Sequence, residues 1–464
     1  MRSSFIFDMI LVWFSLFMLC TADEFAFFDA VEAGDAKAIS EALEAGLVDA
    51  DYNDENGYTP LILASKSGHL DAMNTLLDGG ADIELSADYP APVDTPLTSA
   101  AQNGQLEAVE LLLARGAKID GRGRDGRTAL ISAAAKGCLH AVELLLERGT
   151  TDAAAVDATK LDGSTALSWA AHGGHDQVVL ALLTHGAAVG ARDQFDGSQP
   201  IHFACQGQGF NASSSSSPSN GSTSTSTSPS PLSPGTAGVS GGCGVSSQST
   251  RRVINHLLTF GADAGARTGV TGPRDPNNPG SFKADPKREE LSGGRTPLHV
   301  AAAEGNLEAV RLLLATGVTT TTLSEGGGGE GGGVEVDAVD VQGLSAVALA
   351  AMQGNRKTME LLLDTGGARP DTPARDARAP LHHAAFHGHP ECARLLVKFG
   401  AKVDQPSALT NGEGPGQSPL LVASFQGNAK VVRFLLKAGA NPNSRAKDGA
   451  TPLIAGASGG HAKV

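Results

Sequence analysis

Four histidines lie close together near the C-terminal end of this sequence: His382, His383, His387 and His389. Imidazole is a common metal ligand and proton acceptor. His383 and His387 are four residues apart, so on a helix both side chains project from one face, as zinc ligands often do. A zinc site needs three or four ligands, and no glutamate directly follows His383 as it does in metalloproteases. The sequence therefore predicts no metal site here.

Two further patterns that could do chemistry are incomplete. The glycine-rich run 326–333 could cradle a phosphate if it led into a helix through Lys and Ser or Thr. Val334-Glu335-Val336-Asp337 follows instead, so a flexible linker is expected. Ser, His and Asp are present, but no nucleophile elbow orders them into a triad. We therefore expect no catalytic residue, no bound cofactor and no enzymatic activity.

The clearest pattern in the chain is an internal repeat. Residues 296–317 read TPLHVAAAEGNLEAVRLLLATG, and versions of this segment recur from end to end. Most copies follow one another at intervals of 33 to 39 residues. The copies begin at Thr59, Thr95, Thr128, Thr165, Gln199, Thr296, Ser345, Ala379, Ser418 and Thr451. A repeat of this length predicts a stack of small, similar structural units.

Each copy predicts two short antiparallel helices. Thr296 can cap a helix with its hydroxyl, and Pro297 suits the first helical position because its missing N–H is not needed there. Gly305 can end this helix in the left-handed conformation. Apolar residues at helical spacing over 307–314 predict a second helix, which Gly317 ends. One pair alone buries only part of its apolar face, so neighbouring pairs must stack.

The T-P-L-H-x-A opening, ten recurrences and the 33-residue spacing resemble those of ankyrin-repeat proteins, from about Phe25 to Val464 apart from inserts. The resemblance implies an all-α solenoid of helix-turn-helix pairs, with hairpin-like loops, called fingers, projecting from the connections. It also implies that partners bind at finger tips and at the concave surface of the inner helices. His382 and His389 occupy family positions whose histidines hydrogen-bond between repeats.

The repeat boundaries divide the chain. We expect a signal peptide at 1–22, a capping repeat at 23–58, repeats at 59–209, a disordered Ser/Thr-rich insert at 210–250, completion of the interrupted repeat at 251–267, an extended finger or linker at 268–294, a repeat at 295–318, a Gly-rich insert at 319–335 and repeats at 336–464, the last incomplete.

The N-terminal prediction depends on the apolar stretch Ile10–Cys20, which is shorter than the roughly 20 residues that span a bilayer. A misassigned start or a helix packed on the first repeat would also account for it. Localisation follows from this choice: the secretory pathway if residues 1–22 are cleaved, and otherwise the cytoplasm. A retained segment could tether the chain to a membrane.

The candidate contact residues follow from aligning the copies on the frame T-P-L-H-x-A-A-x-x-G, whose x positions vary within the family. On the inner helices they are Ser99, Gln102, Asn103, Ser132, Lys136, Trp169, His172, Phe203, Gln206, His383, Phe386, His387, Phe425 and Gln426. At the fingers they are Tyr58, Arg124, Arg127 and Phe195. Aromatic side chains in a groove suit binding hot spots, although packing against a neighbouring finger would explain them equally well.

The formal net charge of −15 disfavours nucleic-acid binding, which needs a basic surface. We expect a monomeric, non-enzymatic scaffold or adaptor that binds other proteins. The alternative is the targeting module of a larger enzyme, such as a kinase or ubiquitin ligase, whose catalytic domain is not in this sequence.

Overall fold

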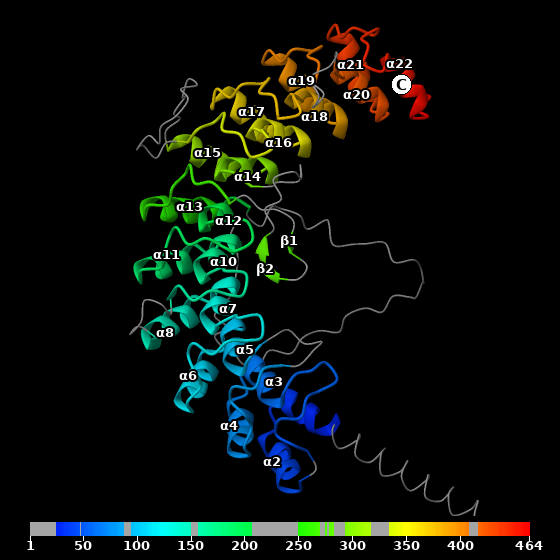
Figure 1. Ribbon diagram of the computed structural model, residues 1–464. Helices are drawn as coiled ribbons and strands as arrows, with labels where there is room; N and C mark the ends of the chain where they lie inside the picture. The colour runs from blue at the N-terminus through cyan, green and yellow to red at the C-terminus, as the bar shows by residue number, and fades with distance from the viewer. Residues whose placement is uncertain are drawn as a thin grey trace, which may run out of the picture.

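A computed structural model shows a crescent built from two parallel rows of short helices (Figure 1). The structure describes residues 25–46, 48–87, 94–149, 156–206, 249–269, 274–275, 278–282, 293–316, 334–407 and 416–464. The predicted signal peptide and most of the predicted inserts lie outside these residues.

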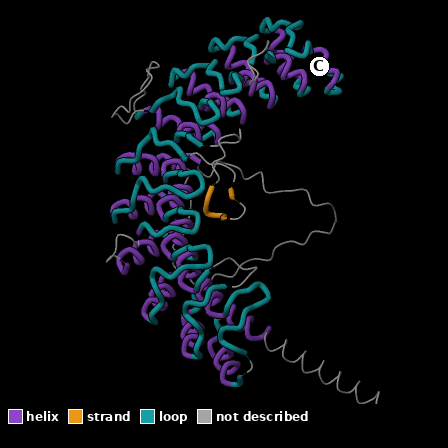
Figure 2. The backbone as a smooth tube through the Cα atoms, in the orientation of Figure 1, coloured by secondary structure: helices purple, strands orange, loops and turns teal. Residues whose placement is uncertain are grey.

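The inner row lines the concave side of the crescent (Figures 1 and 2). It consists of α3 (Pro60–Ser67), α5 (Pro96–Gln102), α7 (Ala129–Lys136), α10 (Ala166–Gly173), α12 (Pro200–Gln206), α14 (Pro297–Glu304), α16 (Ala346–Gln353), α18 (Pro380–His387), α20 (Pro419–Phe425) and α22 (Pro452–Ser458). Each inner helix packs against the next one in the row.

The outer row forms the convex side. It consists of α4 (Leu70–Asp78), α6 (Leu106–Ala114), α8 (Leu139–Gly149), α11 (Asp176–Thr184), α13 (Ser249–Thr259), α15 (Leu307–Ala315), α17 (Arg356–Asp364), α19 (Pro390–Lys398) and α21 (Ala429–Lys437). A helix over 25–33 and α2 (Ala36–Glu44) precede the first full pair. The predicted all-α solenoid is thus confirmed.

The caps expected from the sequence form. Thr296 accepts a hydrogen bond from the backbone N–H of His299 through its side chain, and Pro297 follows in the first turn. Gly305 ends α14 with φ of 74°. A Cβ on Gly305 would lie 2.8 Å from Oδ1 of Asn355, so both conformation and close approach favour glycine there.

A large hydrophobic core runs between the two rows. Ala301, Val310 and Leu313 have no exposed surface, and all belong to a cluster of buried residues that extends through the stacked pairs. Small alanines on the inner helices allow close packing, and leucines of the outer helices fill the space between the rows. Each pair is therefore stabilised mainly by its immediate neighbours.

Successive fingers are joined by hydrogen bonds to the backbone. The Asp371 carboxylate accepts from the N–H of Lys402 at 3.1 Å, and similar bonds join other neighbouring fingers. The Arg267 guanidinium donates to the carbonyl of Val339 at 2.8 Å. These contacts fix the spacing of the fingers along the crescent.

Two features lie near the predicted inserts. The helices α12 and α13 pack together as a pair although residues 207–248 separate them in the sequence. The later helix begins at Ser249, two residues before the predicted resumption at 251. Within the predicted extended finger, β1 (Arg274–Asp275) pairs antiparallel with β2 (Asn278–Phe282) in a short hairpin that was not predicted from the sequence.

Candidate functional site

The histidine cluster is divided between two roles. Nε2 of His382 donates to the carbonyl of Gln417 at 3.0 Å, and Nε2 of His389 donates to the carbonyl of Met352 at 3.0 Å. Both bonds join neighbouring repeats, as the resemblance implied. Burial lowers the pKa of His382 to about 4, so its imidazole is neutral and able to serve as a fixed donor and acceptor.

The other two histidines of the cluster differ in exposure. His383 is 8% exposed, and burial lowers its pKa to about 4. Its Nε2 makes no hydrogen bond to any residue that the structure describes. His387 is exposed, with its ring centroid 5.0 Å from that of Phe386 and 6.3 Å from that of His389. In the described part of the chain, no three His, Cys, Asp or Glu side chains are grouped so that they could hold a metal ion.

The variable positions of the inner helices do not all reach the surface. Counting Thr296 as the first position of its repeat, the fifth position is buried in most repeats. Ser99 is 3% exposed and Ser132 has no exposed surface, so with His383 these side chains are not available to a partner in this structure. The accessible concave surface is formed mainly by the eighth and ninth positions, together with two aromatic exceptions at the fifth.

Those exceptions, Trp169 and Phe203, flank His172 and form an aromatic cluster across α10 and α12. The ring centroid of His172 lies 6.2 Å from that of Trp169 and 6.4 Å from that of Phe203, in edge-to-face geometry. Burial lowers the pKa of His172, and its Nδ1 makes no hydrogen bond within the described ranges. The cluster is half-buried, so it offers a rigid apolar surface to a ligand.

A polar network holds the indole of Trp169 in place. Its Nε1 donates to the Ser164 hydroxyl at 2.8 Å, and the Lys160 ammonium lies 5.2 Å from the ring centroid. Lys160 is ion-paired with Asp125 at 3.5 Å and with Asp162 at 3.4 Å. None of these four residues is among those predicted from the sequence. Ser164 precedes its repeat's Thr just as Tyr58 and Arg127 do, and that shared position is the signal that could have identified it.

A second aromatic surface lies further along the concave face. Phe386 on α18 and Phe425 on α20 occupy the eighth position of adjacent repeats and are 41% and 53% exposed. These two helices pack against each other, so the two rings lie on neighbouring units of the groove. Exposure of two large aromatic side chains in succession is typical of a binding surface rather than of a core.

The remaining candidates on the inner helices are polar. Asn103 donates from its side chain to the carbonyl of Ser99 at 2.8 Å, whereas Oε1 of Gln102 is buried without a hydrogen-bond partner among the described residues. Lys136 is exposed, and Gln206 and Gln426 are half-buried. These residues lie beside the two aromatic surfaces, where they supply adaptable hydrogen-bonding groups.

The finger candidates fall into two groups. Arg124 and Phe195 are exposed at the turns, with Phe195 45% exposed. Tyr58 and Arg127 are half-buried beside the start of an inner helix; Nε of Arg127 lies 3.3 Å from the Asp125 carboxylate. Burial, and after it the nearby Asp94 carboxylate, raise the pKa of Tyr58, so its hydroxyl stays a donor at neutral pH.

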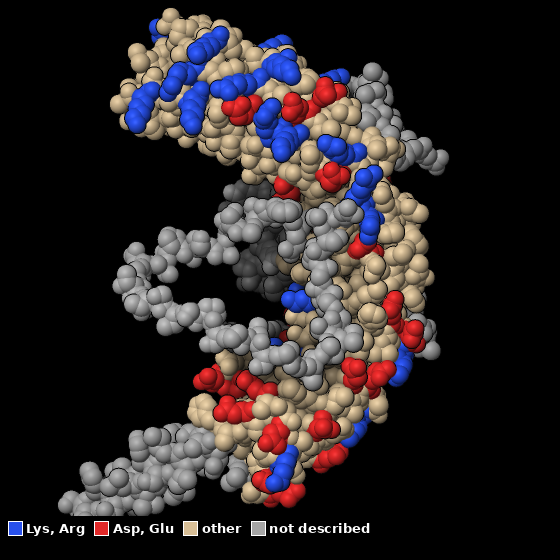
Figure 3. All heavy atoms as spheres, turned by 180° about the vertical axis from the view of Figure 1, so that it is seen from behind, with Lys and Arg blue, Asp and Glu red and all other residues tan. Residues whose placement is uncertain are grey.

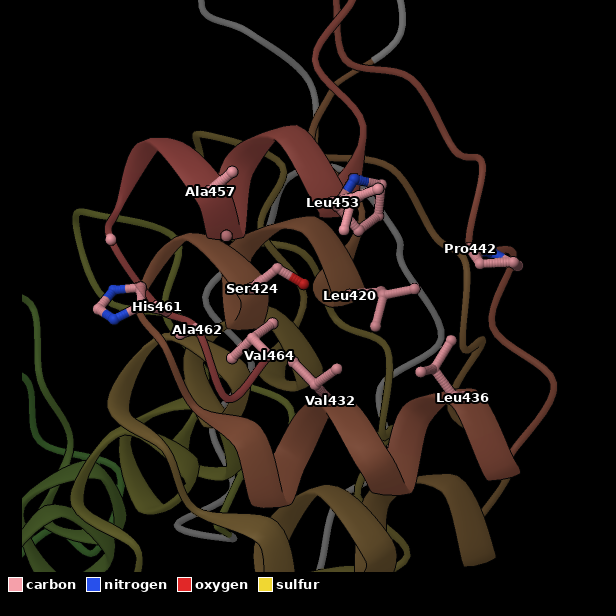
Figure 4. Close-up of a pocket in the computed structure, with 13 residues that line it drawn as sticks. Leu420, Ser424, Val432, Leu436, Pro442, Leu453, Ala457, His461, Ala462 and Val464 are labelled. Carbon is pink, nitrogen blue, oxygen red and sulfur yellow. The ribbon is translucent and has the colours of Figure 1, made fainter.

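A cavity of about 570 Å³ lies among α20, α21 and α22 (Figure 4). It is lined by apolar side chains such as Leu420, Val432 and Leu453, with the His461 ring at one side. In earlier repeats the equivalent surface is covered by the following helix pair. Few polar groups converge on this cavity, so it does not resemble a small-molecule site with fixed specificity.

Comparison with known protein families identifies the same repeats. A model described as "Ankyrin repeats (3 copies)" matches residues 10–87, 89–157 and 323–407, one described as "Ankyrin repeat" matches 162–194 and 293–321, and one described as "Ankyrin repeats (many copies)" matches 381–436.

Similar proteins share the repeat region alone. An E3 ubiquitin-protein ligase of Arabidopsis thaliana, KEG, is 36% identical over 25% of this chain and 7% of its own length. A probable E3 ubiquitin-protein ligase of rice, XBOS31, is 33% identical over 28% of this chain and 26% of its own. The human transient receptor potential cation channel subfamily A member 1 is 29% identical over 23% of this chain and 11% of its own length. The match thus covers about a quarter or less of each relative's length.

None of the described helices combines the length and the apolar character that a membrane span requires.

Proposed function

Because this chain belongs to the ankyrin-repeat proteins, we propose that it is a scaffold or adaptor whose concave face binds a segment of a partner protein. The repeat is a non-catalytic protein-interaction fold, and we propose no enzymatic activity for this chain. The observation that carries the proposal is the placement of exposed or half-exposed aromatic side chains on the helices that line the concave side. Trp169, Phe203, Phe386 and Phe425 all belong to these inner helices (Figure 1).

The groove is suited to an extended partner segment. The two aromatic surfaces lie four repeats apart, on α10–α12 and on α18–α20. Packed helices are roughly 8–10 Å apart, so about four repeats separate the surfaces by on the order of 35 Å. An extended chain covers this distance in about ten residues. We therefore propose two apolar anchors in the partner, separated by about that many residues.

Rigidity supports binding at this face. The indole of Trp169 is fixed by Ser164 and Lys160, and neighbouring repeats are joined by bonds such as that from His389. A preorganised surface loses little conformational entropy when a partner binds, so more of the contact energy appears as affinity.

We predict that Trp169→Ala and Phe386→Ala each weaken partner binding by about 2 kcal/mol or more, roughly 30-fold, because buried aromatic anchors dominate interface energy. The measurement is proximity labelling in native cells to identify partners, followed by titration of one purified partner. Leu180→Ala is the matched control, since Leu180 is 38% exposed on the outer helix α11. If both aromatic variants bind as the control does, the concave assignment is wrong.

The second candidate function is the targeting module of a ubiquitin ligase. It is favoured by the names of the plant relatives, although their similarity covers only repeats. The two proposals differ in the size of the native polypeptide. A scaffold corresponding to this chain has a mass of 47.1 kDa, and a native protein of much greater mass that ubiquitinates its bound partner would favour the ligase module.

A further inference from the structure

The outer row of helices carries a gradient of charge that the concave site does not use. Three positions on each outer helix are equivalent to Glu391, Arg394 and Lys398 of α19. At the N-terminal end of the row, six of the nine residues at these positions of α4, α6 and α8 are acidic, and the other three are Asn74, Ala114 and His140. At its C-terminal end, α19 and α21 expose almost only cations at the same positions. The acidic residues are Asp71, Asp78, Glu107, Glu110, Glu143 and Glu147; the cations are Arg394, Lys398, Lys430, Arg433 and Lys437, with Glu391 as the exception.

Figure 3 shows this separation on one face of the molecule, where Lys and Arg gather over the C-terminal repeats and Asp and Glu over the N-terminal ones. We call the five cations of α19 and α21 the basic outer surface. The two helices pack side by side, so their side chains form one continuous patch. The chain as a whole has a net charge of −15, so this patch is opposite in sign to the rest of the protein.

Three of the five cations make no polar contact within the described part of the chain, and the Lys398 ammonium lies 5.5 Å from the ring centroid of Phe399. Arg394 is bonded to Glu391 at 2.6 Å and covers the ring of Phe434, whose centroid lies 5.9 Å away. In the described part of the chain, no side-chain hydrogen bond or ion pair engages Lys430, Arg433 or Lys437. Lys398 and Lys437 lie in the last turn of their helices, where a cation is favourable, but Lys430 lies in the first turn of α21, where it is not. Adjacent cations also repel one another, so helix stability does not account for the whole cluster.

We propose that the basic outer surface binds an acidic segment of a partner protein, at a place separate from the concave groove. Carboxylates spaced along a short segment would relieve the repulsion among Arg394, Arg433 and Lys437, and would steer association. The exposed positions recur on each helix at helical spacing, so several carboxylates can be bound at once.

The charge gradient favours a short acidic segment over an extended polyanion. Charges more than about 10 Å apart are largely screened at physiological salt, so a short segment on α19 and α21 does not sense the acidic helices α4–α8. A membrane or a nucleic acid extends along the crescent and meets those carboxylates too. The convex surface of the crescent also curves away from a flat bilayer (Figure 1).

The test uses a fluorescein-labelled peptide of about ten glutamates, titrated with the full chain and followed by anisotropy at low salt. The triple variant Arg394→Glu/Arg433→Glu/Lys437→Glu is expected to bind at least about tenfold more weakly. The matched control, Arg252→Glu/Arg311→Glu/Arg356→Glu, changes the net charge equally on the same row but on α13, α15 and α17. Circular dichroism and thermal melts establish that both variants fold.

Retained affinity in the control, with loss in the first variant, supports the proposal. Equal losses in both would overturn it, because binding would then reflect overall charge. Tighter binding to vesicles of phosphatidylcholine and phosphatidylserine than to the peptide would also overturn it, because a membrane would then be the occupant. Salt-sensitive self-association in sedimentation would overturn it as well, because the occupant would then be a second copy of this chain. Trp169→Ala should bind the peptide normally, so failure of the concave proposal remains distinguishable.

Discussion

Acidification from pH 7 to pH 4 is expected to remove much of the free energy of unfolding, through histidines buried in their neutral form. Burial lowers the pKa of His299, His382 and His383 to about 4. In the unfolded chain a histidine titrates near pH 6.5, so between about pH 6.5 and 4 the unfolded state binds more protons than the folded state. The stability that these neutral histidines contribute is therefore fully present above about pH 6.5 and is lost as the pH falls toward 4.

The size of this effect follows from the shift. Each of the three histidines contributes a loss of about 1.4 kcal/mol per pH unit within the window, or about 3 kcal/mol by pH 4. Urea titrations from pH 7 to pH 5 measure the slope before most carboxylates are protonated. The physical cause is burial: His299 is only 1% exposed, so its imidazole would carry an unsolvated charge if it were protonated in the folded state.

Substitution of His299 and His382 by glutamine provides the control. A glutamine amide can still donate to the carbonyls of Leu344 and Gln417, which the two imidazoles contact at 3.1 and 3.0 Å, but it cannot be protonated. The double variant should be less stable at pH 7 and show a clearly shallower decline between pH 6.5 and 5. An unchanged slope would mean that other groups cause the acid sensitivity.

The second large effect is expected from Leu313→Ala. Leu313 has no exposed surface and lies in the core between α15 and its neighbours. Removing it should cost roughly 2–5 kcal/mol, because the transfer free energy is lost and a cavity remains. Since each repeat contacts mainly its neighbours, amide hydrogen exchange should increase most in α13, α14 and α17.

Leu436→Ala is the matched control for this prediction, because it removes the same atoms from a leucine side chain that is 44% exposed. It should cost well under half as much. A melting temperature for Leu313→Ala equal to that of the wild type would show that the core assignment of Leu313 is wrong.

The helix pairs were predictable because their signals are local. Thr296, Pro297 and Gly305 fix the ends of α14 by capping and backbone preference, and the spacing of apolar residues fixes the buried face of α15. These effects act within one repeat and recur in each. The positions of the inner helices could therefore be predicted without any knowledge of long-range contacts.

The site was predictable only in outline. Which variable side chains reach the groove depends on the neighbouring repeat, so the burial of Ser132 could not be inferred from its own segment. The network around Trp169 also needs Asp125 and Lys160, which come from two different fingers. The residue alignment identified the concave face, but three-dimensional packing selects the part of it that is accessible.

The pairing of α12 with α13 around residues 207–248 has a consequence for how such a chain can evolve. The entropy of closing a loop grows slowly, by about 0.6 kcal/mol for each doubling of its length. A helix pair that closes around a long connection therefore tolerates insertions, deletions and exchange of whole segments there. The junction between Gln206 and Ser249 is a place where new sequence can be acquired while the frame of the crescent is inherited unchanged.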